Sequence, residues 1–236
     1  MTAGSVAAAA VDRGGAAGTM PSMFAADVGT GATPVGPAVL EERDLPPGPL
    51  NLLDALGCTR PIDLDVGFGK GRSLVEWSGR GFGGTLLGIE IRRGFVEHAA
   101  RALSRAGTAG VRLVRGDFRA LVPRFVPDGA VRRCFLHFPD PWWKKRHLKR
   151  QVVSGPVVAE LGRLLAPGGE VFVQTDVPER AEEFAGAFRA AGLEQVFPSG
   201  GAARENPFGV RSNRELRCIE AGLPVWRMVF RKVPQA

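Results

Sequence analysis

From Pro61 onward, short apolar runs alternate with segments of helical periodicity, and this alternation restricts the chain to few folds. We expect strands at 62–66, 85–90, 111–115, 131–138 and 170–175, and two more from the C-terminal remainder, including 225–231. We expect helices at 71–77, 95–106, 151–165 and 178–191. Strands that alternate with helices pair in parallel through right-handed crossovers. The sequence therefore predicts an α/β fold with a Rossmann-like, doubly wound, mostly parallel sheet of seven strands.

The residues before this region have a different composition. Residues 1–40 are mostly Ala, Gly, Thr, Val and Pro with few charges, which is typical of a disordered extension. Residues 41–60 contain Pro46-Pro47-Gly48-Pro49 and indicate a linker and entry segment. A length of 236 residues favours one domain over two. We expect residues 61–236 to form that domain.

The composition limits which cellular compartment and which binding partners we expect for this protein. The formal net charge of +7 favours an anionic partner such as nucleic acid. No stretch reaches the about 20 apolar residues that a membrane span needs, and the first residues lack the pattern of a secretory leader. Cys58, Cys134 and Cys218 are far apart and indicate neither a disulfide framework nor a zinc site. We expect a cytoplasmic monomer or homodimer without a membrane partner.

A glycine-rich turn follows the first expected strand. Gly67, Gly69 and Gly71 occupy alternate positions, so the backbone can turn tightly and approach a ligand closely. In a doubly wound sheet this turn lies at the edge where ligands bind. The third glycine of the dinucleotide pattern G-x-G-x-x-G would fall on Arg72, so the turn does not have the NAD fingerprint.

Acidic residues lie at the ends of the first three expected strands. Asp65 precedes the glycines, and Glu90 closes the second strand, where a carboxylate can accept hydrogen bonds from both hydroxyls of an adenosine ribose. Asp117 is placed to accept from an adenine amino group, with Phe118 packing on the ring. Each carboxylate alone is more often a helix cap or a surface residue. Three together indicate an adenosine-containing ligand, and both NAD and S-adenosylmethionine fit.

A distinctive segment, 138–150, follows the fourth expected strand and reads Phe-Pro-Asp-Pro-Trp-Trp-Lys-Lys-Arg-His-Leu-Lys-Arg. A charge run alone is commonly a solvated surface. The segment closely resembles the Asp-Pro-Trp motif and following basic run of the bacterial tRNA (guanine-N7-)-methyltransferases, which are class I S-adenosylmethionine-dependent enzymes. The resemblance extends over 65–71, 88–90, Asp117 and 174–176, and so spans about 61–183.

The resemblance implies roles at the matching positions. The family's S-adenosylmethionine-binding acids correspond to Asp65, Glu90, Asp117 and Asp140, and Asp140 also belongs to the reaction centre. The family's substrate-binding lysine and aspartate correspond to Lys144 and Asp176. Its closing Thr-x-x-Glu substrate motif is matched by Ser212 to Glu215, where serine keeps the hydroxyl. The expected cofactor site therefore comprises Asp65, Gly67, Gly69, Gly71, Glu90, Asp117, Phe118 and Asp140, and the expected substrate site Lys144, Asp176, Ser212 and Glu215.

Transfer of a methyl group to guanine N7 in tRNA fits these residues. N7 exposes a lone pair in the major-groove edge of guanine, so the reaction needs in-line approach and a favourable field rather than a strong base. No metal is implied, and S-adenosylhomocysteine would be the product. His98, His137 and His147 show no triad or metal spacing, so we expect structural or surface roles for them.

Two other functions stay open. The family's Gly-His and Trp-Asp elements appear here only within 222–227, Gly-Leu-Pro-Val-Trp-Arg. This departure leaves room for another acceptor, such as a small purine, a natural-product intermediate or a different RNA. A non-catalytic RNA-binding protein that keeps the fold is the second alternative, and the intact acidic residues disfavour it.

Overall fold

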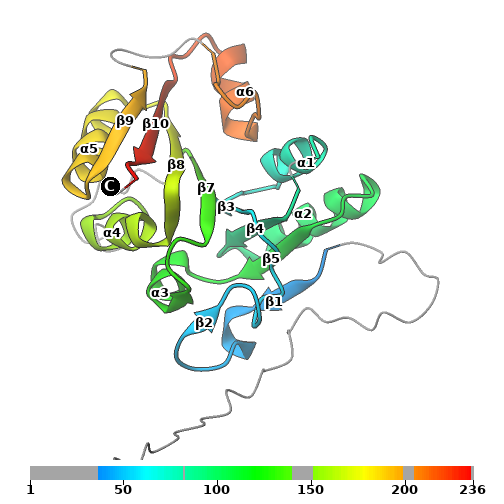
Figure 1. Ribbon diagram of the computed structural model, residues 1–236. Helices are drawn as coiled ribbons and strands as arrows, with labels where there is room; N and C mark the ends of the chain where they lie inside the picture. Colours follow the sequence, from blue (N-terminus) through cyan, green and yellow to red (C-terminus); the bar gives the residue numbers. More distant parts are fainter. Residues whose placement is uncertain (1–36, 82, 140–150, 199–204, 235–236) are drawn as a thin grey trace, which may run out of the picture.

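The structure, a computed structural model, describes residues 37–81, 83–139, 151–198 and 205–234 (Figure 1). Its central sheet has the order β1-β5-β4-β3-β7-β8-β10-β9. The strands are β1 (Val39–Glu41), β3 (Ile62–Val66), β4 (Thr85–Glu90), β5 (Val111–Arg115), β7 (Val131–His137), β8 (Leu165–Thr175), β9 (Leu193–Phe197) and β10 (Trp226–Lys232). All neighbours from β1 to β8 pair in parallel, and β10 pairs antiparallel with both β8 and β9. The predicted mostly parallel α/β fold is confirmed.

The chain order reverses between β3 and β7. From β3 the chain builds β4 and β5 on one side, and β7 then begins the other half of the sheet on the opposite side of β3. A doubly wound sheet leaves a crevice at the carboxyl ends of its strands where this reversal occurs. The fold therefore places the turn after β3 next to the end of β7.

Helices cover both faces of the sheet (Figure 1). One face packs against α1 (Arg72–Ser78) and α2 (Arg93–Arg105). The other face packs against α3 (Phe118–Leu121), α4 (Gly155–Leu164) and α5 (Pro178–Ala190). Helix α6 (Asn213–Glu220), which has eight residues, lies near α1 in Figure 1, beyond the ends of the central strands. None of the described helices is long and apolar enough to cross a membrane.

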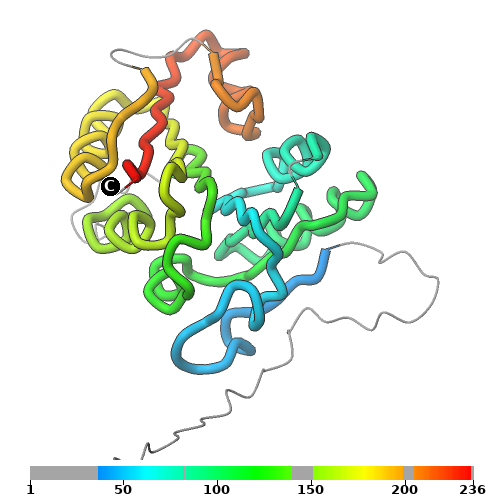
Figure 2. Tube along the Cα trace, in the orientation of Figure 1, coloured from blue at the N-terminus to red at the C-terminus, as the bar shows by residue number. Residues whose placement is uncertain are grey.

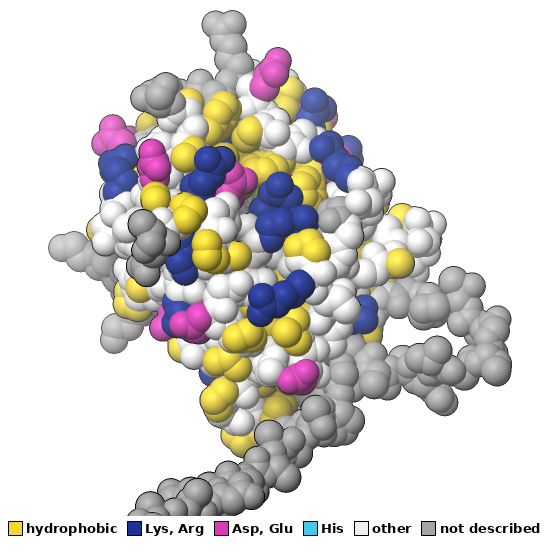
Figure 3. All heavy atoms as spheres, viewed as in Figure 1, with side chains coloured by type: hydrophobic (Ala, Val, Ile, Leu, Met, Phe, Trp, Pro, Cys, Tyr) yellow, Lys and Arg dark blue, Asp and Glu magenta, His cyan; other side chains and the backbone are white. Residues whose placement is uncertain are grey.

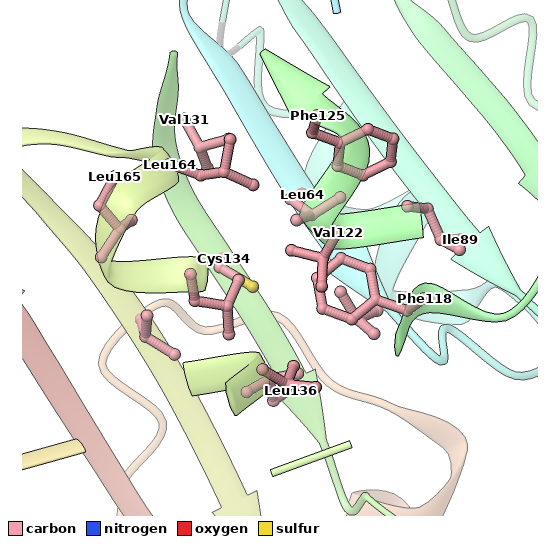
Figure 4. Close-up of a cluster of buried hydrophobic side chains, with 14 of the residues drawn as sticks. Leu64, Ile89, Phe118, Val122, Phe125, Val131, Cys134, Leu136, Leu164 and Leu165 are labelled. Atoms are coloured by element: carbon pink, nitrogen blue, oxygen red, sulfur yellow. The ribbon is translucent and has the colours of Figure 1, made fainter. Parts of the chain in front are cut away.

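The period-two alternation of strands divides their side chains between two cores. Cys134 and Leu136 of β7 belong to the larger core, with Leu164 of α4 (Figure 4). Phe135, between them in sequence, packs on the opposite face against Trp77, with ring centroids 5.1 Å apart. His137 therefore lies on the same face as Phe135, with their rings stacked 5.9 Å apart.

The segment 41–60, expected as a linker, is instead built into the core. It carries η1 (Glu42–Asp44) and β2 (Leu50–Asn51), which pairs with β6 (Phe125–Val126) just after η2 (Val122–Arg124). Leu50 and Leu56 are fully buried, and Figure 2 shows the segment folded back beside α3. The prolines and glycine obscured these core residues, because the short buried runs between them have no strand or helix period.

The edge strand β1 also differs from expectation. Val39 and Leu40 fall within the extension 1–40 but pair with β5, so the sheet has eight strands among the described residues instead of seven. Glu41 continues this strand and pairs with Arg115. Residues 1–36 lie outside the described residues, and the domain boundaries stay predictions.

Replacing Leu50 with alanine tests whether this segment belongs to the cooperative fold. We expect Leu50→Ala to lower the free energy of unfolding by about 2–5 kcal/mol, because it leaves a cavity in the larger core. The matched control Leu223→Ala, at a position with 52% exposure, should change it by less than about 0.5 kcal/mol. Equal denaturant midpoints for the two variants would contradict the assignment of 41–60 to the core.

Candidate active site

Two adjoining cavities lie at the carboxyl ends of the central strands. The first, here called the β4 cavity, has a volume of about 540 Å³ and extends over the ends of β3, β4 and β5. The second, the α6 cavity, has a volume of about 880 Å³ and extends from the glycine turn to α6. Both are lined by Gly67, Gly69, Arg92, Phe95, His137, Phe138 and Pro139. The two cavities therefore share a wall made by the glycine turn and the end of β7.

The three glycines of the turn have two different functions. Gly67 and Gly69 have φ angles of 70° and 58°, and a Cβ added at either would meet no atom within 4 Å. They line both cavities and leave space for a ligand. Gly71 also has a positive φ of 80°, but its added Cβ would lie 2.4 Å from Cβ of Ala99. Gly71 lines neither cavity and instead allows α1 to pack on α2.

Glu90 holds the glycine turn against the end of β4. Its Oε2 accepts a hydrogen bond from the Gly69 N–H at 3.0 Å, and its Oε1 accepts from the Arg92 N–H at 2.9 Å. The Gly67 N–H donates to the carbonyl of Ile89 at 2.8 Å. Glu90 is 6% exposed and lines the β4 cavity. Its carboxylate thus organises the turn and retains acceptor capacity toward the cavity.

Asp117 and Phe118 line the far end of the β4 cavity. The Asp117 carboxylate caps α3 by accepting from the Arg119 N–H at 3.0 Å, and it forms an ion pair with the Arg119 guanidinium. Hydrogen bonds from Arg119 lower the pKa of Asp117. Phe118 is only 4% exposed and belongs mainly to the core. Asp117 is therefore a helix cap and also lies at the cavity, and its expected contact with adenine stays a prediction.

Asp65 lies beneath the glycine turn and does not line either cavity. It is 2% exposed, and its Oδ2 accepts from the Ser73 hydroxyl at 2.7 Å. Burial raises the pKa of Asp65 to about 7, with a smaller contribution from Glu90. Its Oδ1 has no hydrogen-bond partner among the described residues. An unpaired buried carboxylate oxygen is costly unless a cation or donor reaches it.

The structure separates the three described members of the expected substrate site. Asp176 and Ser212 line the α6 cavity. Asp176 forms an ion pair with Arg214, and the Ser212 hydroxyl accepts from the Glu215 N–H at 3.2 Å to cap α6. Glu215 is fully buried and lines neither cavity, because it pairs with Arg227 in the core. Asp140 and Lys144, the other expected residues of the reaction and substrate sites, lie outside the described residues.

Basic side chains surround the α6 cavity. Lys70, Arg92, Arg214 and Arg217 line it, with the acids Asp176 and Glu220. Figure 3 shows Lys and Arg side chains spread across the visible face with apolar side chains between them. A cationic wall of this kind raises the local concentration of an anionic ligand.

Sequence reasoning missed His137, Phe138 and Phe95 as cavity residues. Phe95, at the start of the helix expected at 95–106, lines both cavities, and the Arg92 guanidinium lies 5.2 Å from its ring centroid. His137 was expected to be structural, but it lies where the two cavities meet. Phe138 follows it with a φ of 50°, a conformation that a non-glycine residue rarely adopts. The sequence signal that could have identified His137 and Phe138 was their position at the carboxyl end of a central strand.

The β4 cavity fits an adenosyl ligand. Its volume lies within the range of about 300–1,000 Å³ that is common for cofactor sites. Two glycines leave their Cβ positions open, and the carboxylates of Glu90 and Asp117 lie at the ends of neighbouring strands. Among residues 37–81, 83–139, 151–198 and 205–234, no group of three acidic, histidine or cysteine side chains could hold a metal ion.

Comparison with known proteins agrees with this geometry. Residues 59–228 match the family described as "Putative methyltransferase". A tRNA (guanine-N(7)-)-methyltransferase from Synechococcus sp. (strain JA-3-3Ab) is 37% identical over 71% of this chain and 71% of its own length. The protein of the same name from Anaeromyxobacter dehalogenans (strain 2CP-C) is 35% identical over 71% of this chain and 83% of its own length.

Solved structures show the same fold. A "SAM dependent methyltransferase" from Aquifex aeolicus aligns with a TM-score of 0.50 and 17% identity, covering 73% of this chain and 82% of its own. At this identity the likeness supports the architecture alone. The family match and the two relatives lead to one conclusion. The chain belongs to the tRNA (guanine-N(7)-)-methyltransferase family of S-adenosylmethionine-dependent enzymes.

Proposed function

We propose that the protein methylates N7 of a guanine in tRNA with S-adenosylmethionine as methyl donor. One observation carries this proposal: a cavity suited to an adenosyl group and a cavity with basic walls meet at the glycine turn and the end of β7. A donor in the first and a base in the second would face each other across that junction. The family relationship supports the same pairing of donor and acceptor.

The residues of the β4 cavity would bind and orient the donor. Glu90 accepts hydrogen bonds from the ribose hydroxyls, Gly67 and Gly69 allow close approach of the backbone, and Asp117 lies toward the adenine. Burial raises the pKa of Asp65 beneath the turn, and the cationic part of a bound donor would stabilise the ionised form of its carboxyl group. When bound, S-adenosylmethionine supplies an electrophilic methyl group on a positively charged sulfur.

The α6 cavity would present the guanine. Its N7 lone pair forms the new N–C bond while the C–S bond breaks, and that electron pair stays on sulfur as S-adenosylhomocysteine. No proton moves in this step, so the protein needs to align the reactants and stabilise the positive charge that develops on the purine. Asp176, on the cavity wall, and Asp140 are our proposed sources of negative charge.

A polynucleotide explains the charge of the α6 cavity better than a free base does. Lys70, Arg92 and Arg217 line the cavity and can contact phosphates, whose binding dominates affinity for nucleic acids. Lys144 and the basic residues that follow it are proposed to extend this contact. The net charge of +7 acts in the same direction.

Two glycine variants test the donor site. We expect Gly69→Ala to weaken binding of S-adenosylhomocysteine at least tenfold, since the methyl group enters the cavity and the positive φ costs about 1 kcal/mol. Gly71→Ala should instead cause the larger loss of thermal stability, because its methyl group collides with Ala99. Calorimetric titration and thermal denaturation measure the two effects. Equal stability losses combined with equal donor affinities would contradict the division of function within the turn.

The identity of the acceptor is tested by comparing two substrates. With labelled donor, we expect methyl transfer to unmodified tRNA and none to an equal concentration of guanosine monophosphate, because the basic wall requires several phosphates. Mass spectrometry of the digested tRNA should show 7-methylguanosine. Methylation of the free nucleotide without methylation of tRNA would support a small-molecule acceptor instead and would contradict the proposal.

A further inference from the structure

A chain of polar side chains leads from the core to the junction of the two cavities. Arg227 and Glu215 form an ion pair with both side chains at most 5% exposed. Glu215 Oε2 accepts from the Gln174 side-chain N–H at 3.1 Å, and the same Gln174 nitrogen lies 2.7 Å from Nδ1 of His137. His137 pairs directly with Gln174 in the β7–β8 register, so the sheet itself sets this contact. The chain ends at a residue that lines both cavities.

Glu215 determines which way the Gln174 amide points. An ionised carboxylate can only accept hydrogen bonds, so the Gln174 NH₂ group must face Glu215. Glu215 is itself held by the Arg227 guanidinium at 2.9 Å and by the Asn206 amide at 3.2 Å. The Gln174 nitrogen therefore donates to His137, and Nδ1 of His137 accepts.

This contact fixes the state of the imidazole. A neutral imidazole has one N–H, and because Nδ1 accepts, the proton resides on Nε2. Burial lowers the pKa of His137 to about 4, so the ring is neutral near pH 7. Phe135 stacks on one side with an interplanar angle of 1°, and Phe172 packs in an edge-to-face arrangement with its ring centroid 5.7 Å from that of His137. The ring is thus held in one orientation and one tautomer.

The remaining N–H has no partner within the described part of the chain. Nε2 of His137 is buried and makes no hydrogen bond there. A buried donor without an acceptor costs about 1–3 kcal/mol, so a bound acceptor atom at this position gains more than an ordinary hydrogen bond. A neutral donor also suits the reaction, because an imidazolium would repel the positive charge that develops on the methylated purine.

We propose that the Nε2–H of His137 donates a hydrogen bond to O6 of the target guanine, an inference that rests on the proposed function. O6 lies beside N7 on the major-groove edge of guanine, whereas adenine carries an amino donor there. His137 would therefore select guanine against adenine. Glu215 and Gln174 act as positioning residues, because they orient the imidazole without reaching the cavities.

Three tRNAs that differ only at the target base test this contact. They carry guanosine, inosine, which keeps O6 but lacks the 2-amino group, or 2-aminopurine, which lacks O6. We expect His137→Phe, which keeps a ring but has no donor, to lower kcat/KM about tenfold on guanosine and equally on inosine. Its kcat/KM on 2-aminopurine should match that of the unaltered protein. His137→Gln, which retains an N–H, should restore part of the loss on the first two tRNAs.

Several results would overturn this inference. An equal loss on all three tRNAs would show that His137 acts only through the fold, and thermal unfolding midpoints would report the same damage. A tenfold weaker affinity of His137→Phe for S-adenosylhomocysteine would place the N–H on the donor instead of the base. If the unaltered protein methylates none of the three tRNAs, the proposed function itself is refuted, independently of the function of His137.

Discussion

The hydrogen bond that Glu90 accepts from the Gly69 N–H connects the turn after β3 to the end of β4, and a second bond from the Arg92 N–H holds the same carboxylate in place. Without this carboxylate, the Gly69 N–H would need another acceptor, and the open conformation of the turn at positive φ would lose support. The shape of the β4 cavity follows from that turn. So does the wall that the cavity shares with the α6 cavity.

The reversal of chain order determines what lies opposite the turn. Because β7 starts the second half of the sheet beside β3, its last residues reach the same edge as the glycines. His137 and Phe138 stand there, and β8 and α6 supply the outer wall through Asp176 and Ser212. One topological feature thus brings together residues that are more than a hundred positions apart in sequence.

Much of the fold could be predicted from sequence, and so could the positions of Gly67, Gly69 and Glu90 beside the cavities. Buried parallel strands such as β3 and β4 are short apolar runs ended by glycines or acids, so periodicity finds them. Leu50 and Leu56 were missed because prolines interrupt any period around them. Glu215 was matched by motif, but a motif does not show whether a carboxylate faces a cavity or an arginine in the core. The contact between His137 and Gln174 depends on the register between β7 and β8, which sequence alone does not give.

Calorimetric titration of S-adenosylmethionine tests whether Glu90 organises the donor site. Glu90→Gln replaces one acceptor oxygen with an NH₂ group that must face a backbone N–H, either that of Gly69 or that of Arg92. We expect the unaltered protein and the surface control Glu97→Gln to bind the donor alike. We expect at least tenfold weaker binding by Glu90→Gln, with the fold retained. Equal dissociation constants for all three proteins, or no binding by the unaltered protein, would contradict this function of Glu90.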